Sequence, residues 1–584
     1  MRRDIIRAYV VCSILSVACA IAAPHSVLAQ DSTWFRDITT QAGLDSIMNY
    51  FIYVADVDND DYPDLVLQAG VQEPNQIRLF MNRAGTSAGE RAFVETTGES
   101  GINGEGRIAD LAALADLDND GDADLVTATY YYDKKGDCTP NPDNGGRCEV
   151  LLNDGLGHFT LKAGNGLHDL GPIPGSSLSF LDFDRDGIID LFIGTHYQSN
   201  FCDGIGASKY LMKGRGDGTF SDASEQSGIS SYIEALFGSN AGDWNNDCHQ
   251  DILTAVYAGT GTGNLWKNNG DGTFIDVAEE TGYNPHFVPG DNGQPMVPWA
   301  AEPYDFDNDG DMDLLFMMVH GGNAATEGRS TFFINQGSAG GYALVPDINR
   351  IERAVPRSSH HGDNQGRFLD FDNNGLADLV LTECVYQPAT DRLYFLMQDT
   401  SHSFRDITAG LGFITGTAAS SIGGNIRNPH AAEPIDFDLD GDDDLVVGKY
   451  PTDRRFLLLR NDIGSGNNHV AVKLVAPPGV NGSAIGARVT VVAGDLTQMR
   501  DIYAGQGNFA AQQPFILNFG LGNRTIDRIE VRWPDATCSR TVVENPPLNQ
   551  LLRIGRDGII SSGVEGDEGL PGEMDLTRSM RYER

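Results

Sequence analysis

One acidic pattern recurs seven times along the chain, and it constrains the fold more than any other feature. The pattern D-x-[DN]-x-[DN]-x-x-x-D-[LI] repeats with steps of 60, 66, 61, 62, 65 and 66 residues. A single copy is an ordinary acidic turn, but a near-constant period is the signature of a repeat architecture. The seven copies begin at Asp56, Asp116, Asp182, Asp243, Asp305, Asp370 and Asp436.

Each copy is surrounded by the same strand signals. An apolar stretch precedes it and a β-rich stretch follows it, as in 124–128 and 444–448. A third β signal and a Gly/Asp turn into a fourth follow, as in 265–268 and 272–276. Four short strands per unit, joined by turn-rich loops, are typical of a propeller blade. The sequence therefore predicts an all-β fold, a seven-bladed β-propeller over 31–462, followed by a small all-β domain.

The phase of the repeat predicts how the ring closes. The last copy is followed by a third strand near 456–460, but by no fourth strand. Residues 34–39 (Trp-Phe-Arg-Asp-Ile-Thr) match residues 403–408 (Ser-Phe-Arg-Asp-Ile-Thr) almost residue for residue. We therefore expect the N-terminal segment to complete the last blade, which leaves no open sheet edge between the first and last units.

The repeated loops have the composition of cation sites. Positions 1, 3, 5 and 9 carry oxygen, and position 6 is usually glycine, which permits the positive φ of a tight turn. Oxygen ligands of this number, with a backbone carbonyl at position 7, suit Ca²⁺. The sequence predicts up to seven Ca²⁺ sites. The predicted ligands are Asp56, Asp58, Asp60 and Asp64; Asp116, Asp118, Asp120 and Asp124; Asp182, Asp184, Asp186 and Asp190; Asp243, Asn245, Asp247 and Asp251; Asp305, Asp307, Asp309 and Asp313; Asp370, Asp372, Asn374 and Asp378; and Asp436, Asp438, Asp440 and Asp444.

The seven loops are not equally complete. The first has Asp61 in place of the glycine, and the sixth has Asn374 at position 5. The fourth is the most degenerate, because Asn245 replaces a carboxylate and Cys248 stands at the turn. Individual sites, the fourth above all, are therefore less secure than the pattern as a whole.

The charge of the chain fits this interpretation. A net charge of −41 excludes a generic nucleic-acid binder, which needs a basic surface. Twenty-six of the predicted ligands are carboxylates, and they account for more than half of that excess. The acidity is thus largely metal-site chemistry rather than a surface for a basic partner.

The N-terminus and the cysteines both fit export. Residues 1–29 have a basic start, an apolar run and a small-residue end, as in a signal peptide. A twin-arginine or lipoprotein variant of that signal stays open. We expect an extracellular, periplasmic or cell-surface protein, with no later segment apolar enough to span a bilayer. Of the six remaining cysteines, only Cys138 and Cys148 share one loop, so they form either a disulfide or a pair of free thiols.

The pattern changes after a Gly/Ser/Asn linker at 463–468. Residues 469–555 contain β-branched or alternating runs separated by Gly and Pro, which predict a second, all-β domain. The stretch 556–584 is rich in glycine and charge, and it is predicted to be a disordered tail.

The two parts resemble known families. The repeats over 31–462 resemble the FG-GAP/VCBS repeat, the unit of integrin-α-type propellers. The C-terminal part resembles the ASPIC/UnbV domain in four ordered blocks, and the whole chain resembles the secreted family related to cartilage acidic protein. This resemblance implies an extracellular, calcium-binding protein associated with matrix or carbohydrate. The four blocks are Asn481-Gly-Ser-Ala-Ile-Gly-Ala-Arg-Val489, Gly505-Gln-Gly507, Phe519-Gly-Leu-Gly522 and Ile529-Glu-Val-Arg-Trp-Pro534.

Two classes of function stay open at this point. The leading one is a secreted calcium-binding scaffold for adhesion to a glycan, matrix or protein partner, with no catalysis. The alternative is a calcium-dependent polysaccharide lyase or hydrolase with its site at the propeller channel. Its acid/base candidates are the polar residues that enter the innermost strands. They are Glu302, His360, His361, His430 and Glu433. Convergence of these side chains would favour the enzyme, and their dispersal would favour binding.

Overall fold

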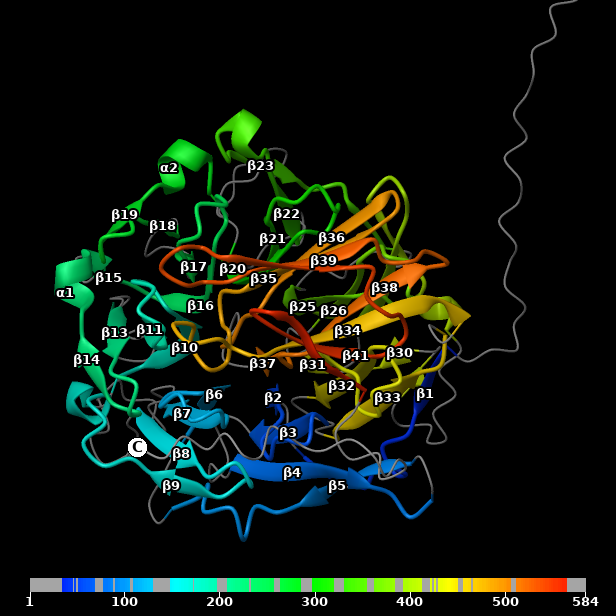
Figure 1. Ribbon diagram of the computed structural model, residues 1–584, viewed down its shortest axis with the longest axis horizontal. Coiled ribbons are helices and arrows are strands. Elements are labelled where there is room, and N and C mark those ends of the chain that lie inside the picture. Colours follow the sequence, from blue (N-terminus) through cyan, green and yellow to red (C-terminus); the bar gives the residue numbers. More distant parts are fainter. Residues whose placement is uncertain are drawn as a thin grey trace, which may run out of the picture.

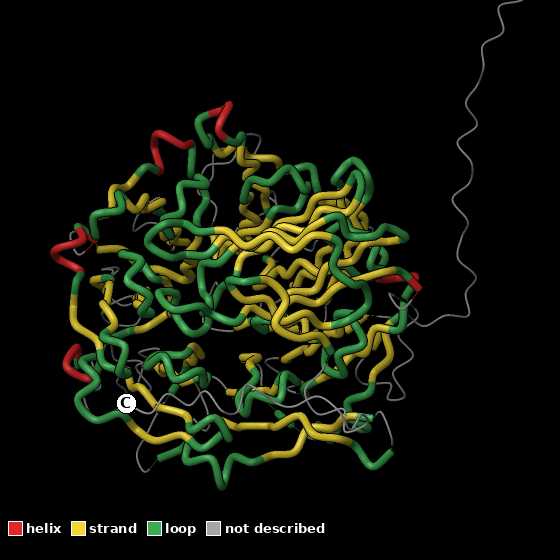
Figure 2. Tube along the Cα trace, viewed as in Figure 1, coloured by secondary structure: helices red, strands yellow, loops and turns green. Residues whose placement is uncertain are grey.

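A computed structural model describes most of the chain. The described residues are 34–45, 47–48, 51–68, 77–87, 90–104, 109–129, 148–171, 173–196, 207–229, 233–256, 263–284, 297–319, 330–353, 362–383, 392–411, 421–422, 425–426, 429–449, 455–463, 466–505 and 511–563. They are nearly all strand and loop, and the few short helices lie at the rim (Figure 2). Within this part of the chain, no helix is long and apolar enough to cross a membrane.

Seven sheets of the described residues are built alike, and we call them blades 1 to 7. Blade 1 contains β2 (Phe51–Ala55), β3 (Asp64–Gln68), β4 (Ile77–Ala84) and β5 (Arg91–Glu95). Blade 2 contains β6 (Leu111–Ala115), β7 (Asp124–Ala128), β8 (Glu149–Asn153) and β9 (Phe159–Leu161). Blade 3 contains β10 (Gly175–Leu181), β11 (Asp190–Thr195), β13 (Tyr210–Gly214) and β14 (Phe220–Asp222). Blade 4 contains β16 (Leu236–Gly242), β17 (Asp251–Val256), β18 (Leu265–Asn268) and β19 (Phe274–Asp276).

The remaining blades continue the series. Blade 5 contains β20 (Val297–Tyr304), β21 (Asp313–Val319), β22 (Thr331–Asn335) and β23 (Leu344–Asp347). Blade 6 contains β25 (Asp363–Leu369), β26 (Asp378–Glu383), β27 (Leu393–Gln398) and β28 (Phe404–Asp406), with β24 (Ile351–Glu352) beside β28. Blade 7 contains β31 (Pro429–Ile435), β32 (Asp444–Lys449), β33 (Leu457–Asn461) and β1 (Phe35–Asp37). Minor elements are β12 (Ala207–Ser208), β15 (Ile233–Glu234), β29 (Ser421–Ile422), β30 (Asn425–Ile426), α1 (Ser224–Ser227), α2 (Ala278–Thr281) and three 3₁₀ turns, His168–Leu170, Ser338–Gly340 and Thr408–Gly410.

The first strands of the blades contact one another in a closed cyclic order. That order is β2, β6, β10, β16, β20, β25, β31 and again β2. Figure 1 shows the sheets arranged around this centre. The predicted all-β propeller is confirmed.

The core lies between neighbouring blades, because each inner strand is covered on both faces. β7 and β32 are buried along their whole length, which explains their continuous apolar and β-branched sequences. Between blades 5 and 6 the rings of Phe332 and Phe404 stack with centroids 5.3 Å apart, beside Phe306. Aromatic side chains of this size dominate the apolar area that such a contact buries.

The N-terminal strand closes the ring as the repeat phase predicts. β1 pairs antiparallel with β33 through Phe35 and Asn461, Arg36 and Arg460, and Asp37 and Leu459. This pairing joins the two ends of the propeller within one blade and covers the edge of β33.

The C-terminal module consists of two four-stranded sheets. One contains β34 (Asn468–Leu474), β38 (Leu517–Gly522), β41 (Leu551–Gly555) and β42 (Gly558–Ser562). The other contains β35 (Arg488–Ala493), β36 (Leu496–Asp501), β39 (Arg528–Arg532) and β40 (Arg540–Glu544). The predicted tail is wrong at its start, because β42 pairs with β41 and extends the sheet past residue 556.

The module lies across the ring and reaches its innermost strands (Figure 1). β37 (Ala511–Gln512) pairs parallel with β2. The Gln512 side chain accepts a hydrogen bond from the Leu114 N–H at 2.8 Å and donates one to the Leu114 carbonyl at 3.0 Å. A segment of the module therefore occupies the centre of the ring beside blades 1 and 2.

The cysteines pair differently from the sequence-based expectation. Cys148 is a free, buried thiol just before β8, packed in the apolar core with Val150. Of the two alternatives that the sequence left open, the disulfide with Cys138 is therefore wrong. Cys138 itself lies outside the described residues. Among the described residues, a disulfide joins Cys248 to Cys538, which are 290 residues apart in sequence. Spacing along the chain gives no signal for such a pair.

Closure by β1 predicts a specific loss of stability. Phe35 is 2% exposed and packs against Phe371 and Phe395, with ring centroids 5.5 and 5.0 Å away. Phe35→Ala should therefore cost about 3–5 kcal/mol of unfolding free energy. The matched control is Arg36→Ala on the same strand, whose half-exposed side chain should contribute less than about 1 kcal/mol. Urea unfolding followed by tryptophan fluorescence measures both, and equal losses would show that β1 does not close the ring.

Candidate metal centres

The acidic loops all connect the first and second strands of their blades. We number them 1 to 7 after the blades: 56–64, 116–124, 182–190, 243–251, 305–313, 370–378 and 436–444. Position 9 of each loop is the first residue of the second strand. Equivalent connections lie at the same end of every blade, so the loops share one face of the propeller.

Backbone hydrogen bonds shape each loop around its first carboxylate. In loop 2, Asp116 accepts hydrogen bonds from the N–H groups of Asp120 at 3.1 Å and Gly121 at 2.9 Å. The same two bonds are present in all seven loops. They require a positive φ at position 6, which is 97° at Gly121 and 69° at Asp61. The aspartate in loop 1 therefore adopts the turn that the sequence predicts for glycine.

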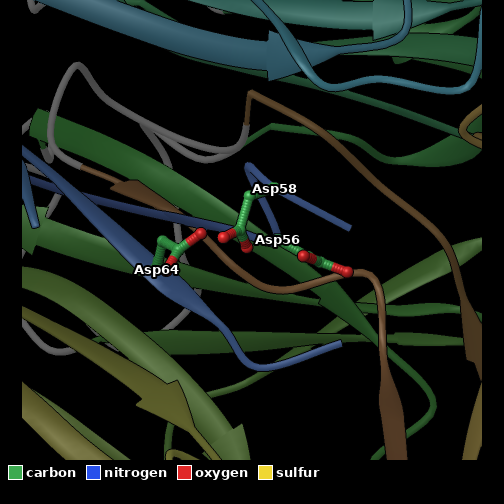
Figure 3. Close-up of side chains that lie close together, drawn as sticks. All are labelled: Asp56, Asp58 and Asp64. Atoms are coloured by element: carbon green, nitrogen blue, oxygen red, sulfur yellow. The ribbon is translucent and has the colours of Figure 1, made fainter. Parts of the chain in front are cut away.

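The carboxylates at positions 1, 3 and 9 gather in at least five loops, with one oxygen from each residue within 4.8 Å of the others. Figure 3 shows the three carboxylates of loop 1. The position 5 carboxylate is not a member of these groups. One of its oxygens accepts the N–H of position 7, as Asp120 Oδ1 does from Asp122, which leaves its other oxygen for a cation. The structure thus brings together three of the four predicted side-chain ligands. The five groups are Asp56, Asp58 and Asp64; Asp116, Asp118 and Asp124; Asp182, Asp184 and Asp190; Asp305, Asp307 and Asp313; and Asp370, Asp372 and Asp378.

The carboxylate at position 3 has a buried oxygen that a bound cation would satisfy. In five loops its Oδ1 atom is buried and has no hydrogen-bond partner among the residues that the structure describes. A buried carboxylate oxygen left in this way is costly, and a bound cation would remove the cost. The residues therefore fit a hard divalent cation with oxygen ligands. The five atoms belong to Asp58, Asp118, Asp307, Asp372 and Asp438.

Burial raises the pKa of several of the loop carboxylates. Burial raises the pKa of Asp116 to about 7, and the neighbouring charges of Asp120 and Asp118 add to that rise. Burial likewise raises the pKa of Asp124 to about 8 and that of Asp182 to about 7. Without a cation, the ionised loop is therefore unfavourable near neutral pH.

Two sets of asparagines connect the loops to adjacent blades, and the motif-based predictions include neither set. Asn153, at the end of β8, donates through Nδ2 to the Val57 carbonyl of loop 1 at 2.8 Å. Asn119, at position 4 of loop 2, has a φ of 60° and donates to the Gly187 carbonyl of loop 3 at 3.1 Å. The signal is present in the sequence, because asparagine recurs at each place in five of the seven units and at both places in four.

The C-terminal module covers the loop face and contacts the loops directly. Ser483 accepts a hydrogen bond from the Asp116 N–H at 2.8 Å, and the Asn373 carbonyl accepts one from the Gly522 N–H at 2.7 Å. In loop 1, Lys473 lies 2.8 Å from an Asp56 oxygen. Module and metal loops therefore form one continuous interface.

The channel residues converge only in part. Glu302 and Glu433 both contact the buried guanidinium of Arg367, at 2.5 and 2.9 Å. Burial raises the pKa of Glu302 to about 7, although the Arg367 charge opposes this. His430 is buried beside Phe51, and burial lowers its pKa to about 3. His360 and His361 lie outside the described residues.

Comparisons with known proteins agree with this architecture. The FG-GAP-like repeat family matches residues 56–127 and 243–316, and the ASPIC and UnbV family matches residues 478–560. The chain thus contains FG-GAP-like repeats and, after them, an ASPIC and UnbV domain, as its motifs indicate.

Its curated relatives include cartilage acidic protein 1 of Xenopus tropicalis and of Mus musculus. The first is 23% identical over 87% of this chain and 73% of the relative, and the second is 24% identical over 87% and 74%. A solved exotype rhamnogalacturonan lyase, YesX, is 11% identical with a TM-score of 0.36, over 71% of this chain and 72% of that one. We infer no activity from a likeness at this level.

The raised pKa values predict an unusual pH dependence for the protein stripped of divalent cations. A carboxyl whose folded pKa exceeds its ordinary value of 3.8 stabilises the fold at low pH, and that stability is lost as pH rises through the folded pKa. For Asp116, Asp124 and Asp182 this loss begins above the ordinary pKa of 3.8 and is complete at about pH 7 to 8. With excess chelator, the melting temperature should therefore fall between about pH 5.5 and about pH 8. Saturating divalent cation should abolish the fall, and a melting temperature that rises across this interval in chelator would contradict it.

Proposed function

We propose that this protein is an exported, calcium-binding scaffold that binds an extracellular glycan or matrix partner without catalysis. The observation that carries the calcium assignment is the buried, unpartnered third-position oxygen in the loops, facing carboxylates from positions 1 and 9. Several carboxylate oxygens in a tight loop are the ligands that Ca²⁺ prefers. Bound Ca²⁺ would supply the positive charge that these groups need, and the protein side chains would fix its position.

Export and an extracellular partner rest on different support. Residues 1–29 have the pattern of a signal peptide, and the curated relatives carry the name cartilage acidic protein 1. The propeller is a rigid ring with many connecting loops, which are the usual carriers of binding residues. The loop face is covered by the C-terminal module, so we assign the partner to the remaining surface of the ring.

The alternative, a polysaccharide lyase or hydrolase at the channel, is disfavoured by the arrangement of its candidates. Arg367 lies between the carboxylates of Glu302 and Glu433, and Gln513 of the module is 3.3 Å from Glu302. Both carboxylates are fully buried. A general acid and base must reach the substrate, whereas these groups satisfy a structural arginine.

Calcium should stabilise the fold strongly. Each occupied site with Ca²⁺ at 100 times its dissociation constant contributes about 2.7 kcal/mol, so several sites outweigh the stability of an ordinary domain. EDTA at neutral pH should therefore lower the melting temperature. Asp118→Ala, in a complete loop, should lose more of the calcium-dependent stabilisation than Asn245→Ala in loop 4. An unchanged melting temperature in EDTA, or equal losses in the two variants, would refute the assignment.

Glycan-binding and polysaccharide-cleavage assays distinguish a binding scaffold from an enzyme. The mature protein should bind one or more glycans on an array, should lose that binding in chelator, and should leave acidic and neutral polysaccharides uncut. Chain cleavage that disappears in the Glu302→Gln/Glu433→Gln double variant, with folding intact by circular dichroism, would establish the enzyme instead.

A further inference from the structure

Loop 4 differs from the other loops in the side chain at position 3. Asn245 stands there, and both ends of its amide are used within the loop. Its Nδ2 donates to an Asp247 oxygen at 3.0 Å, and its Oδ1 accepts the Asp247 N–H at 3.0 Å. Loop 4 therefore lacks the inward-facing third-position carboxylate that marks the other loops as cation sites.

A guanidinium of the C-terminal module contacts the first carboxylate of this loop. Arg532, the last residue of β39, donates from Nη2 to Asp243 Oδ2 at 2.6 Å. The Arg532 and Asp243 side chains are 11% and 4% exposed, so the pair is largely shielded from water. A charge-assisted bond of this kind supplies the positive charge that the first-position carboxylate would otherwise receive from a metal.

A second guanidinium strengthens the positive field around loop 4. Arg488 donates from Nη2 to the Asp243 carbonyl at 2.9 Å and from Nη1 to the Asn246 side chain. It is held in place by Asp501, with Nε–Oδ1 at 2.6 Å. Asp501 balances part of the Arg488 charge, so the repulsion of a divalent cation comes mainly from Arg532, with Arg488 adding to it.

A disulfide joins the same parts of the two domains. Cys248 occupies position 6 of loop 4 with a φ of 70°, where the complete loops have glycine. Its partner Cys538 lies between β39 and β40, six residues after Arg532, with the two Cα atoms 6.1 Å apart. The β39–β40 hairpin is therefore fastened to loop 4 by one ion pair and one covalent bond.

Loop 1 shows that a basic residue of the module does not by itself remove a metal site. Lys473 contacts Asp56 and Asp61 there, yet Asp58 keeps its unpartnered buried oxygen next to Asp56 and Asp64. In loop 3, Lys213 of the same blade contacts Asp184 and Asp186, but its side chain is one-third exposed and can turn away on its flexible stem. Loop 4 alone among the seven combines a lost carboxylate, a shielded arginine and a disulfide.

We propose that Arg532 takes the place of Ca²⁺ in loop 4, so that blade 4 holds the C-terminal module where the other blades hold a metal. This inference rests on the proposed calcium sites in the other loops. In this proposal six loops bind Ca²⁺, and loop 4 is a metal-independent attachment point for the module.

The test is to restore a metal site in loop 4. The double variant Asn245→Asp/Arg532→Gln returns a carboxylate to position 3 and removes the competing guanidinium, while the Cys248–Cys538 bond retains the hairpin. Calcium bound per protein, measured by equilibrium dialysis and native mass spectrometry after stripping and reloading, should rise by one relative to the parent. Asn245→Asp alone should not gain an ion. The control is Arg540→Gln on the same hairpin, whose side chain is 61% exposed and which should leave the count unchanged.

The outcomes separate this inference from the proposed function. A parent protein that binds one ion for each of its seven loops overturns the role of Arg532 and leaves the calcium scaffold intact. A parent that binds no calcium overturns the proposed function. A folded double variant with no extra ion shows that Arg532 is not what keeps the metal out. Where the double variant does not fold, the parent count decides alone.

Discussion

The repulsion among buried carboxylates is the constraint on which this structure depends. Side-chain oxygens from three aspartates lie within 4.8 Å of one another in loop after loop, and backbone N–H groups satisfy only some of them. Burial and like charge both disfavour the ionised state, as the pKa of about 8 at Asp124 shows. The proposed Ca²⁺ ions would neutralise these carboxylates and make the loops rigid links between strands. Most of the chain's large acidic excess is explained in this way.

The loops matter beyond their own blades because each is connected to an adjacent one. Asn153 joins blade 2 to the backbone of loop 1, and Asn119 joins loop 2 to loop 3. Such bonds couple the conformation of one loop to that of the next. A cation bound at one site would therefore also stabilise the neighbouring loops. The C-terminal module then rests on this ordered face and inserts β37 beside β2. Blade 4 has replaced the cation with a protein charge, Arg532, and so attaches the module without metal.

Local pattern was sufficient to predict the fold and the clustering of positions 1, 3 and 9. The period of the acidic loops defined the blades, and the match of 34–39 to 403–408 predicted the β1–β33 pairing. Position 5 stays a predicted ligand; spacing alone did not show that one of its oxygens also accepts a backbone N–H of its own turn. The contacts that sequence could not predict are long-range: Cys248 with Cys538, and Asp243 with Arg532. Cys248 in place of glycine was visible as an anomaly, yet nothing local identified its partner.

Anomalous X-ray diffraction from crystals grown in calcium tests this account most directly, because it counts and locates the ions in one experiment. The account predicts anomalous peaks beside the position 1, 3 and 9 carboxylates of loops 1, 2, 3, 5, 6 and 7, with the Arg532 guanidinium and no peak at Asp243. Loops without anomalous density would contradict the claim that bound calcium neutralises the buried carboxylates. A peak in loop 4 beside Asp243 would contradict the substitution of arginine for metal.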